Sequence, residues 1–196
     1  DAKHFPISLN KKTVKEIHKE GGTILGSSRG NQSPTEMVNQ LVALNINVLF
    51  AIGGDGTLRG AMAIADEITK RKLPINVVGI PKTIDNDLGY VEKTFGFETS
   101  VHVASDIISS AYNEAKGAEN GVGIVRLMGR DSGFIAAAAS LANSVVDFCL
   151  IPELDFNLEG EKGLNKALSR RLEDKQNAVI VVAEGAGQKL FKGANQ

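Results

Sequence analysis

The chain of 196 residues has the composition of a globular protein, with 42% hydrophobic and 23% charged residues. Its 22 basic and 23 acidic residues leave a net charge of −1, so no positive field is available to attract a nucleic acid or an anionic membrane. The one cysteine, Cys149, excludes an internal disulfide and a cysteine-cluster metal site, and it favours a reducing, cytoplasmic location.

The longest apolar stretch, residues 134–146, is interrupted by polar residues and is shorter than the roughly 20 residues that span a bilayer. No membrane helix is therefore predicted. The sequence opens at Asp1 without a methionine or a signal-like segment, which predicts an excerpt of a longer protein.

Short β-branched runs alternate with longer amphipathic segments, the pattern of β-α units that build a parallel sheet. The predicted strands are residues 23–25, 47–52, 76–80, 123–127, 146–151 and 178–183. Most are almost wholly apolar, which is typical of strands covered on both faces. The pattern predicts an α/β fold with parallel, Rossmann-like sheets flanked by helices.

Two helix starts are visible between these strands. Ser33, Pro34 and Glu36 form a capping signal that predicts a helix beginning at residue 34. A second helix is predicted from Ser100 to near Gly117, because its apolar residues recur at helical spacing. The glycine-rich segment 116–121 that follows is a candidate boundary, which divides the chain into two α/β lobes.

Polar or glycine-rich loops follow four of the predicted strands: residues 53–57, 81–87, 128–133 and 152–153. Ligands of open α/β sheets bind beyond the carboxyl ends of the strands. The four loops are therefore expected to meet at one rim of the sheet and to form the functional site.

The first loop, Gly-Gly-Asp-Gly-Thr, has the features of a phosphate and metal site. Gly54 and Gly56 allow close backbone approach, the following helix offers its N-terminal amides, and Asp55 can hold a divalent cation. The alternative is a tight turn in which Asp55 only caps the helix.

The second loop groups Asp85 and Asp87 with Thr83 and Lys82 at the next strand end. Such a grouping suits phosphoryl transfer, in which one carboxylate holds Mg²⁺, another accepts the proton of the attacking hydroxyl, and cations balance charge. Asp55 is the metal candidate and Asp85 the base; Arg130 and Arg29 are the candidate cations. The alternatives are turn-forming aspartates and ordinary surface arginines.

Taken together, the motifs resemble the 6-phosphofructokinase family. They are Gly-Gly-Asp-Gly-Thr at 53–57, Pro-Lys-Thr-Ile-Asp-Asn-Asp at 81–87, Phe-Gly-Phe-Glu-Thr at 95–99, Met-Gly-Arg at 128–130 and Pro-Glu at 152–153. The likeness runs from Gly-Gly-Thr-Ile-Leu-Gly-Ser-Ser-Arg at 21–29 to Ala-Glu-Gly-Ala-Gly at 183–187, and it is greatest to the long plant, protist and bacterial branch related to the pyrophosphate-dependent enzymes.

The resemblance implies two lobes of a phosphofructokinase fold, with a nucleotide and magnesium lobe at 1–119 and part of a sugar-phosphate lobe at 120–196. It implies that ATP phosphorylates the 1-hydroxyl of fructose 6-phosphate in glycolysis, with Asp85 and Arg130 catalytic and Asp55 on Mg²⁺. The implied nucleotide-binding residues are Arg29, Gly54, Asp55, Gly56, Thr57 and Lys82. The implied sugar-binding residues are Thr83, Ile84, Asp85, Met128, Gly129, Arg130 and Glu153. A homotetramer or homodimer is also implied.

Two departures bear on this reading. The family's N-terminal glycine-rich phosphate loop and its C-terminal His and Arg sugar-phosphate ligands are absent from the sequence. Gly121 also stands where the short bacterial enzymes place an arginine, so the resemblance, which implies an allosteric enzyme, does not by itself imply their intersubunit phosphate contact and allosteric scheme.

Two residues give conflicting indications of the phosphoryl donor. Gly56 matches the ATP-using members, whereas Lys82 is shared by pyrophosphate users and the long ATP-using branch. We weight Gly56, because a carboxylate there would meet the α-phosphate of a nucleotide.

Three other interpretations remain. A pyrophosphate-dependent phosphofructokinase is the first, and a diacylglycerol, sphingosine or NAD kinase with the same Gly-Gly-Asp-Gly-Thr motif is the second. The third is a regulatory subunit without catalysis, which predicts a broken Asp85 or Arg130, and both residues are present.

Overall fold

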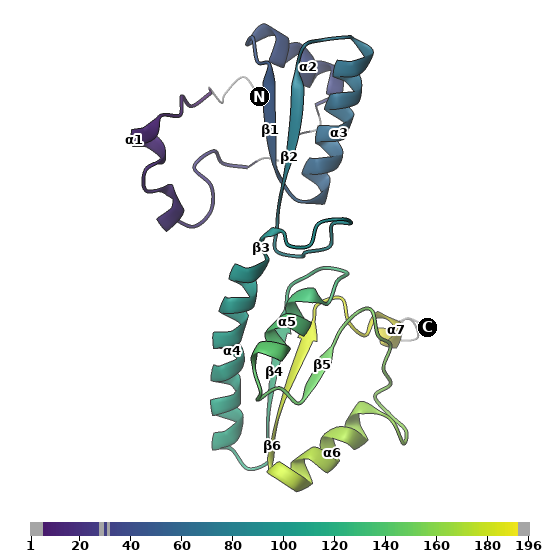
Figure 1. Ribbon diagram of the computed structural model, residues 1–196. Coiled ribbons are helices and arrows are strands. Elements are labelled where there is room, and N and C mark those ends of the chain that lie inside the picture. The colour runs from purple at the N-terminus through teal and green to yellow at the C-terminus, as the bar shows by residue number, and fades with distance from the viewer. Residues whose placement is uncertain (1–5, 28–29, 31, 192–196) are drawn as a thin grey trace.

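The computed structural model describes residues 6–27, 30 and 32–191. Two parallel three-stranded sheets lie at opposite ends of an elongated molecule and are joined through β3 and α4 (Figure 1). The predicted α/β class with parallel, helix-flanked sheets is confirmed. In the part of the chain that the structure describes, no helix has both the length and the apolar character needed to cross a membrane.

The first sheet has the strand order β1-β2-β3, with β1 at Val48–Gly53, β2 at Asn76–Thr83 and β3 at Phe95–Gly96. The helices α2 (Pro34–Ala43) and α3 (Asp55–Lys70) lie on one side of it. Val38, Ile64 and Ile68 form the buried centre of this half. In the parallel register Gly53 is level with Pro81, so the loops after β1 and β2 leave the sheet side by side.

The expected covering of both faces is wrong for β1. Leu49 packs against the cluster under α2 and α3, but Val48, Phe50 and Ile52 on the opposite face are 44%, 60% and 53% exposed. Both helices lie on the Leu49 side, and on the other face of this edge strand Ile52 borders a pocket formed with the N-terminal segment (Figure 1).

The N-terminal segment contains the short helices α1 (Lys11–Val14) and η1 (Ile17–Lys19). The predicted strand at 23–25 is wrong, because these residues form an exposed turn. The Leu25 amide donates to Thr23 Oγ1 at 3.2 Å and the Gly26 amide donates to the Thr23 carbonyl at 3.3 Å. These local bonds satisfy backbone groups that a strand would pair with a neighbour.

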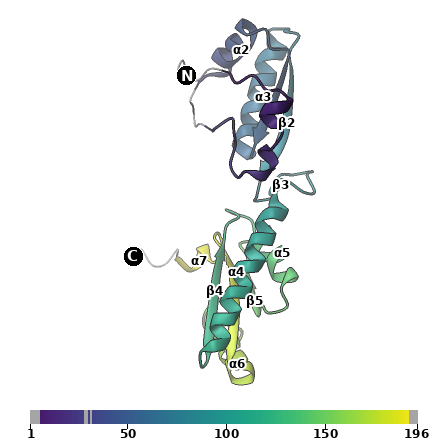
Figure 2. The same ribbon diagram turned by 90° about the vertical axis from the view of Figure 1, so that its left-hand side faces the viewer.

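The second sheet has the order β4-β6-β5, with β4 at Gly121–Leu127, β5 at Phe148–Leu150 and β6 at Asn177–Ala183. Around it lie α4 (Phe97–Gly117), α5 (Phe134–Ala142), α6 (Leu164–Lys175) and the short α7 (Gln188–Phe191). Val179 and Val181 on the central strand β6 are fully buried with Ile108 of α4 and Ala136 of α5. Figure 2 shows α4 running the length of this sheet.

The strand predicted at 146–151 begins two residues late and ends one residue early. A turn bond from the Val146 amide to the Asn143 carbonyl precedes it. Asp147 then pairs with β6 through its side chain, whose Oδ2 accepts from the Val179 amide at 2.9 Å. Arg171 of α6 lies 2.6 Å from the other carboxylate oxygen, which ties α6 to this edge.

Both predicted helices are present, with a difference at one start. The capping box at α2 is formed, since Ser33 Oγ accepts from the Glu36 amide and the Ser33 amide donates to Glu36 Oε2. The second predicted helix, α4, begins at Phe97 rather than Ser100, directly after β3.

The packing of α4 belongs to the second sheet, where Ala104 and Ile108 contribute to the core. The change from one sheet to the other therefore lies between β3 and α4. The division of function at residue 119 stays a prediction.

Candidate functional site

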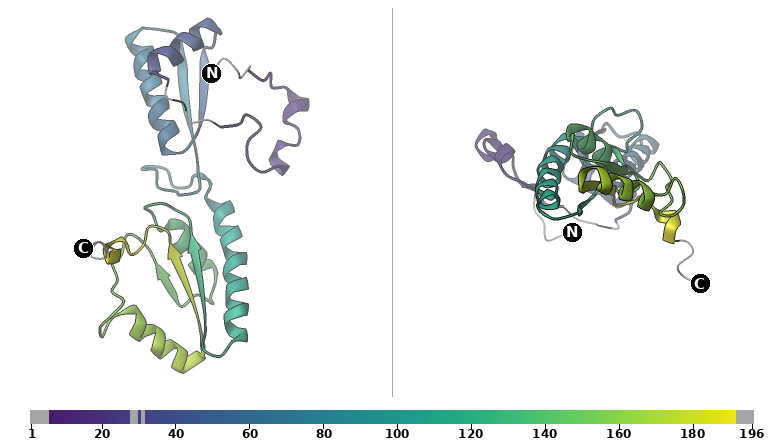
Figure 3. Two further views of the ribbon diagram at one scale, coloured as in Figure 1. Left: turned by 180° about the vertical axis from the view of Figure 1, so that it is seen from behind. Right: turned by 90° about the horizontal axis from the view of Figure 1, so that it is seen from below.

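The carboxyl ends of the strands in both sheets point toward the junction between the two halves (Figure 1; Figure 3, left). The four loops therefore come from two sheets that face each other, and the expectation of a single sheet rim is wrong. The loops at 53–57 and 81–87 extend from the first sheet, and those at 128–133 and 152–153 from the second.

In the first loop Gly54 is the N-cap residue of α3 and Asp55 lies in the first turn. A Cβ atom on Gly54 would lie 3.6 Å from Thr83 Cβ, so this loop packs against the second. The Asp55 carboxylate forms an ion pair with Arg59, one turn further along α3. Around Gly56 the space that a Cβ would enter is open, and the side chain of Thr57 lies over Gly53.

The second loop is organised by side-chain hydrogen bonds. Thr83 Oγ1 lies 3.2 Å from Asp85 Oδ2, to which it donates, and it accepts from the Asp85 amide at 3.2 Å. Asn86 has a left-handed φ of 56°, and its Oδ1 accepts from the Thr94 amide at 2.8 Å. Thr94 Oγ1 in turn donates to the Thr83 carbonyl at 2.8 Å. Asp85 is thus buried in a loop whose backbone is held at several points.

A hydrogen bond joins this loop to the other half of the molecule. Ser132 Oγ lies 3.0 Å from the carbonyl oxygen of Asp85, 47 residues away in the sequence. Ile84 also packs against the core cluster of the second sheet. These two contacts hold the candidate base beside the Met-Gly-Arg loop.

Glu184, just after β6, holds the turn at Gly129 and Arg130. Its Oε1 accepts from the Gly129 amide at 3.1 Å and from the Arg130 amide at 2.6 Å. The turn needs such support because Gly129 and Arg130 have φ values of 140° and 55°, and a side chain on Gly129 would lie 2.6 Å from the Ser132 carbonyl. Sequence reasoning did not select Glu184, although it lies inside the motif at 183–187.

Glu153 reaches the third loop from the end of β5. Its Oε1 accepts from the Gly133 amide at 2.8 Å, at the N-terminus of α5. Gly133 admits this approach, since a Cβ there would lie 2.5 Å from Ile151 Cβ and 2.7 Å from Glu153 Oε2. The carboxylate therefore connects the loop at 152–153 to the loop at 128–133.

The predicted site residues differ in their access to solvent. Asp85 and Gly129 are buried, whereas Lys82, Met128, Arg130 and Glu153 are exposed. Arg29 lies outside the described residues. Exposed cations beside a buried carboxylate can meet a phosphorylated ligand while the carboxylate is held in place.

Among the residues that the structure describes, no cluster of three or more His, Cys, Asp or Glu side chains could hold a metal. The Asp55 carboxylate at the start of α3 could hold Mg²⁺ as a single protein ligand. In nucleotide sites one or two carboxylates commonly bind Mg²⁺ in this way, and substrate phosphates and water supply the other ligands.

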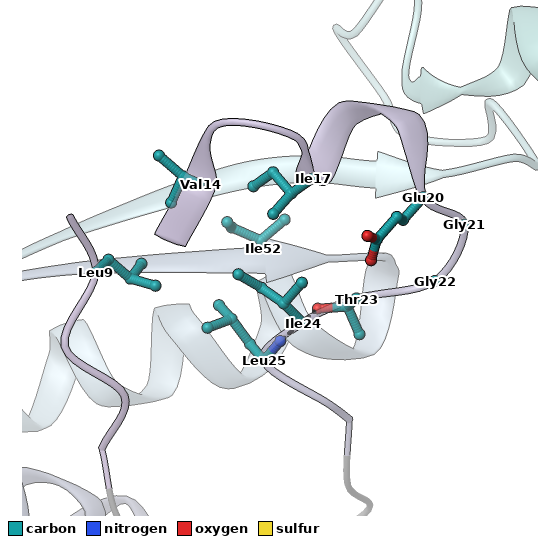
Figure 4. Close-up of a pocket in the computed structure, with 10 residues that line it drawn as sticks. All are labelled: Leu9, Val14, Ile17, Glu20, Gly21, Gly22, Thr23, Ile24, Leu25 and Ile52. Atoms are coloured by element: carbon teal, nitrogen blue, oxygen red, sulfur yellow. Dashed lines mark hydrogen bonds between the residues drawn. The ribbon is translucent and has the colours of Figure 1, made fainter. Parts of the chain in front are cut away.

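An apolar pocket of about 300 Å³ lies elsewhere, between the N-terminal segment and β1 (Figure 4). Leu9, Val14, Ile17 and Leu25 of the segment line it together with Ile52 of β1, and Glu20 lies at one side. None of the predicted site residues lines it. This pocket is separate from the site at the junction.

Comparison with known proteins places these observations in a family. A family model described as Phosphofructokinase matches residues 3–195. The ATP-dependent 6-phosphofructokinase of Borreliella burgdorferi is 56% identical over 191 residues, covering 94% of this chain and 43% of that protein. The chloroplastic ATP-dependent 6-phosphofructokinase 5 of Arabidopsis thaliana is 53% identical over 189 residues, covering 96% of this chain and 35% of that protein.

A solved structure, the pyrophosphate-dependent phosphofructokinase of Marinobacter aquaeolei, superposes with a TM-score of 0.78 at 26% identity, covering 90% of this chain and 46% of that one. The chain thus spans less than half the length of these relatives. The resemblance read from the five motifs is confirmed across nearly the whole sequence: the chain belongs to the phosphofructokinase family.

Proposed function

We propose that the full-length protein transfers a phosphoryl group from ATP to the 1-hydroxyl of fructose 6-phosphate, giving fructose 1,6-bisphosphate. The supporting observation is the set of contacts that joins the four loops across the junction. Gly54 lies against Thr83, Asp85 bonds to Ser132, and Gly133 bonds to Glu153. These contacts support a single site that combines a phosphate-type loop, a buried carboxylate and an exposed arginine.

Asp85 is the proposed general base. It is itself buried, and Thr83 donates to one of its carboxylate oxygens, which fixes the rotation of the carboxylate. A base must lie within hydrogen-bond reach of the hydroxyl it deprotonates, and a fixed carboxylate satisfies this without reorganisation. Ile84, Met128, Gly129, Arg130 and Glu153 are proposed to line the sugar-phosphate site beside it.

The start of α3 is proposed as the nucleotide phosphate site. The N-cap residue Gly54 supplies no side-chain cap to the amides of the first turn, which comprises Asp55, Gly56 and Thr57, and a helix N-terminus favours an anion. Asp55 would hold Mg²⁺, which when bound would neutralise charge on the phosphates. Lys82 and Arg29 are proposed to contact the same phosphates.

ATP is the proposed donor because the space around Gly56 is open, and a carboxylate there would oppose the α-phosphate by bulk and charge. Pyrophosphate is the second candidate, favoured by the exposed Lys82 and by the likeness to the Marinobacter structure, whose title names pyrophosphate. A diacylglycerol-kinase-like or NAD-kinase-like activity would leave the contacts of Asp85 and Arg130 unused.

A homotetramer or homodimer in the cytoplasm completes the proposal. Val103 and Ile107, one turn apart on α4, are 55% and 53% exposed and would be covered in such an assembly. The Arabidopsis relative is named chloroplastic, so the location needs its own measurement.

A coupled assay of the full-length protein tests the reaction. Fructose 6-phosphate and Mg²⁺ are supplied with either ATP or pyrophosphate, and formation of fructose 1,6-bisphosphate is measured. We expect turnover with ATP and little with pyrophosphate. Folded protein that forms no fructose 1,6-bisphosphate with either donor would contradict the proposal.

A further inference from the structure

Ser132 is one of the few buried polar side chains in the described residues, with 7% of its surface exposed. Its hydroxyl oxygen lies 3.0 Å from two carbonyl oxygens, that of Gly129 in its own loop and that of Asp85 in the other half of the molecule. A hydroxyl has a single proton, so it can donate fully to only one of them.

The backbone decides which carbonyl receives that proton. The Ser132 amide already donates to the Gly129 carbonyl at 3.0 Å and supplies that acceptor with a partner. The hydroxyl proton is therefore available for the Asp85 carbonyl, in a buried region where an unpaired acceptor is costly.

The peptide groups of Asp85 are then held on both sides by hydroxyls. Thr83 Oγ1 accepts from the Asp85 amide within the first half, and Ser132 Oγ donates to the Asp85 carbonyl from the second half. Fixing both groups sets the direction in which the Asp85 side chain leaves the backbone. Ser132 itself is too buried to meet a substrate.

We propose that Ser132 is a positioning residue that holds Asp85 in its reactive orientation across the junction between the halves. This inference rests on the proposed function, because it depends on Asp85 being the base. Orientation of a reacting group affects turnover more than substrate affinity, and small misplacements cost large factors in rate.

The first test is Ser132→Ala in the full-length enzyme. We expect kcat to fall about tenfold or more, whereas KM for fructose 6-phosphate stays within twofold. Ser140→Ala is the matched control, because Ser140 Oγ is also buried but has no hydrogen-bond partner among the described residues. Its kcat should not change. A Ser132→Ala enzyme with kcat within twofold of the parent would overturn the inference.

A double-mutant cycle with Asp85→Asn separates the inference from the proposed function. If Ser132 acts through Asp85, adding Ser132→Ala to Asp85→Asn should lower kcat no further. Full additivity would overturn the positioning role. If Asp85→Asn alone keeps its turnover, the proposed function fails, whereas a loss with Asp85→Asn and none with Ser132→Ala removes only this inference.

Ser132→Cys covers the case in which the alanine variant does not fold. A thiol fills similar space but donates a weak hydrogen bond. We expect a kcat between those of the parent and the alanine variant, at a thermal midpoint close to that of the parent. A Cys variant with the turnover of the parent would count against the inference on the same twofold criterion.

Discussion

Asp85 combines burial with a fixed carboxylate, one oxygen of which accepts from Thr83. If it is the general base, Asp85→Asn keeps the shape but cannot accept the hydroxyl proton. We expect kcat to fall about 100-fold or more with little change in KM for fructose 6-phosphate. Steady-state kinetics with ATP and Mg²⁺ measures both constants, and near-normal turnover would rule out Asp85 as the base.

A substitution at Gly56 tests the choice of phosphoryl donor. The position is open in the structure, so Gly56→Asp can be accommodated by the fold. The added carboxylate should raise KM for ATP about tenfold or more, because like charges oppose each other near the helix start, while KM for fructose 6-phosphate changes less than twofold. Gly56→Ala, which adds bulk without charge, is the matched variant. Unaltered ATP kinetics in Gly56→Asp would show that this residue does not select the donor.

If Asp55 holds Mg²⁺, Arg59 competes with that cation for the carboxylate. The two side chains form an ion pair on α3, and the Arg59 side chain is 74% exposed. Exposed pairs contribute about 0–1 kcal/mol, so removing the guanidinium should favour metal binding only slightly. We predict that Arg59→Gln lowers the Mg²⁺ concentration for half-maximal activity by about two- to fivefold. A Mg²⁺ titration measures this, and a higher requirement would contradict the role given to Asp55.

At the scale of single elements, the capping box sets the start of α2. Ser33 Oγ accepts from the Glu36 amide at 3.2 Å, and loss of an N-cap side chain costs about 1 kcal/mol. Ser33→Ala should therefore lower the free energy of unfolding by about that amount in urea denaturation. Ser110→Ala is the control, because Ser110 bonds to the Asp106 carbonyl inside α4, where alanine is a better helix former. Equal losses in both variants would argue against the cap.

The capping box of α2 also makes the stability of the fold depend on pH. The hydrogen bond from the Ser33 backbone amide, followed by the one from its hydroxyl, holds the pKa of Glu36 below its ordinary value of 4.5. Because the pKa of Glu36 is lower in the folded state, its ionised side chain contributes to the stability of the fold. This contribution is fully present above pH 4.5 and is lost as the pH falls through the folded-state pKa. Ser33→Ala keeps the backbone amide and removes only the hydroxyl, so the stability difference between the parent and Ser33→Ala should shrink only in part as the pH falls, which urea denaturation across this pH range measures.

At the scale of the whole molecule, Ile84 connects the two halves. It follows β2 of the first sheet yet packs against the core of the second. Fully buried Ile→Ala changes cost about 2–5 kcal/mol, and the half-buried Ile84 should cost about 1–2 kcal/mol. We expect Ile84→Ala to lower both stability and kcat, since the Asp85 loop loses its apolar contact with the second half.

Leu141→Ala is the control, because Leu141 is 90% exposed on α5. Thermal unfolding and the coupled assay are applied to both variants. An Ile84→Ala enzyme with the stability and turnover of Leu141→Ala would show that this contact does not hold the halves together.

Much of the fold could be predicted because its signals are local. The capping box needs only residues three apart, and the apolar strands with their polar ends follow from alternation of segment types. The motifs at 53–57, 81–87 and 128–130 identified the family for a similar reason, since each is a short run whose spacing is visible in one dimension.

Other features depended on partners distant in the sequence. Residues 23–25 combine the β-branched Thr23 and Ile24 with the apolar Leu25, but hydrogen bonds within a turn take the place of a neighbouring strand. The exposed face of β1 could not be predicted, because both α2 and α3 pack on the other side of the sheet.

The sequence by itself determined the α/β class, the family and the loops that carry the candidate chemistry, because each is encoded in contiguous residues. Only the tertiary structure showed that these loops extend from two opposed sheets, that Glu184 supports the Arg130 turn, and that Ser132 reaches the Asp85 carbonyl. Those contacts join residues 54 and 47 positions apart. Their partners are chosen by the packing of the two halves, which no local pattern of residues specifies.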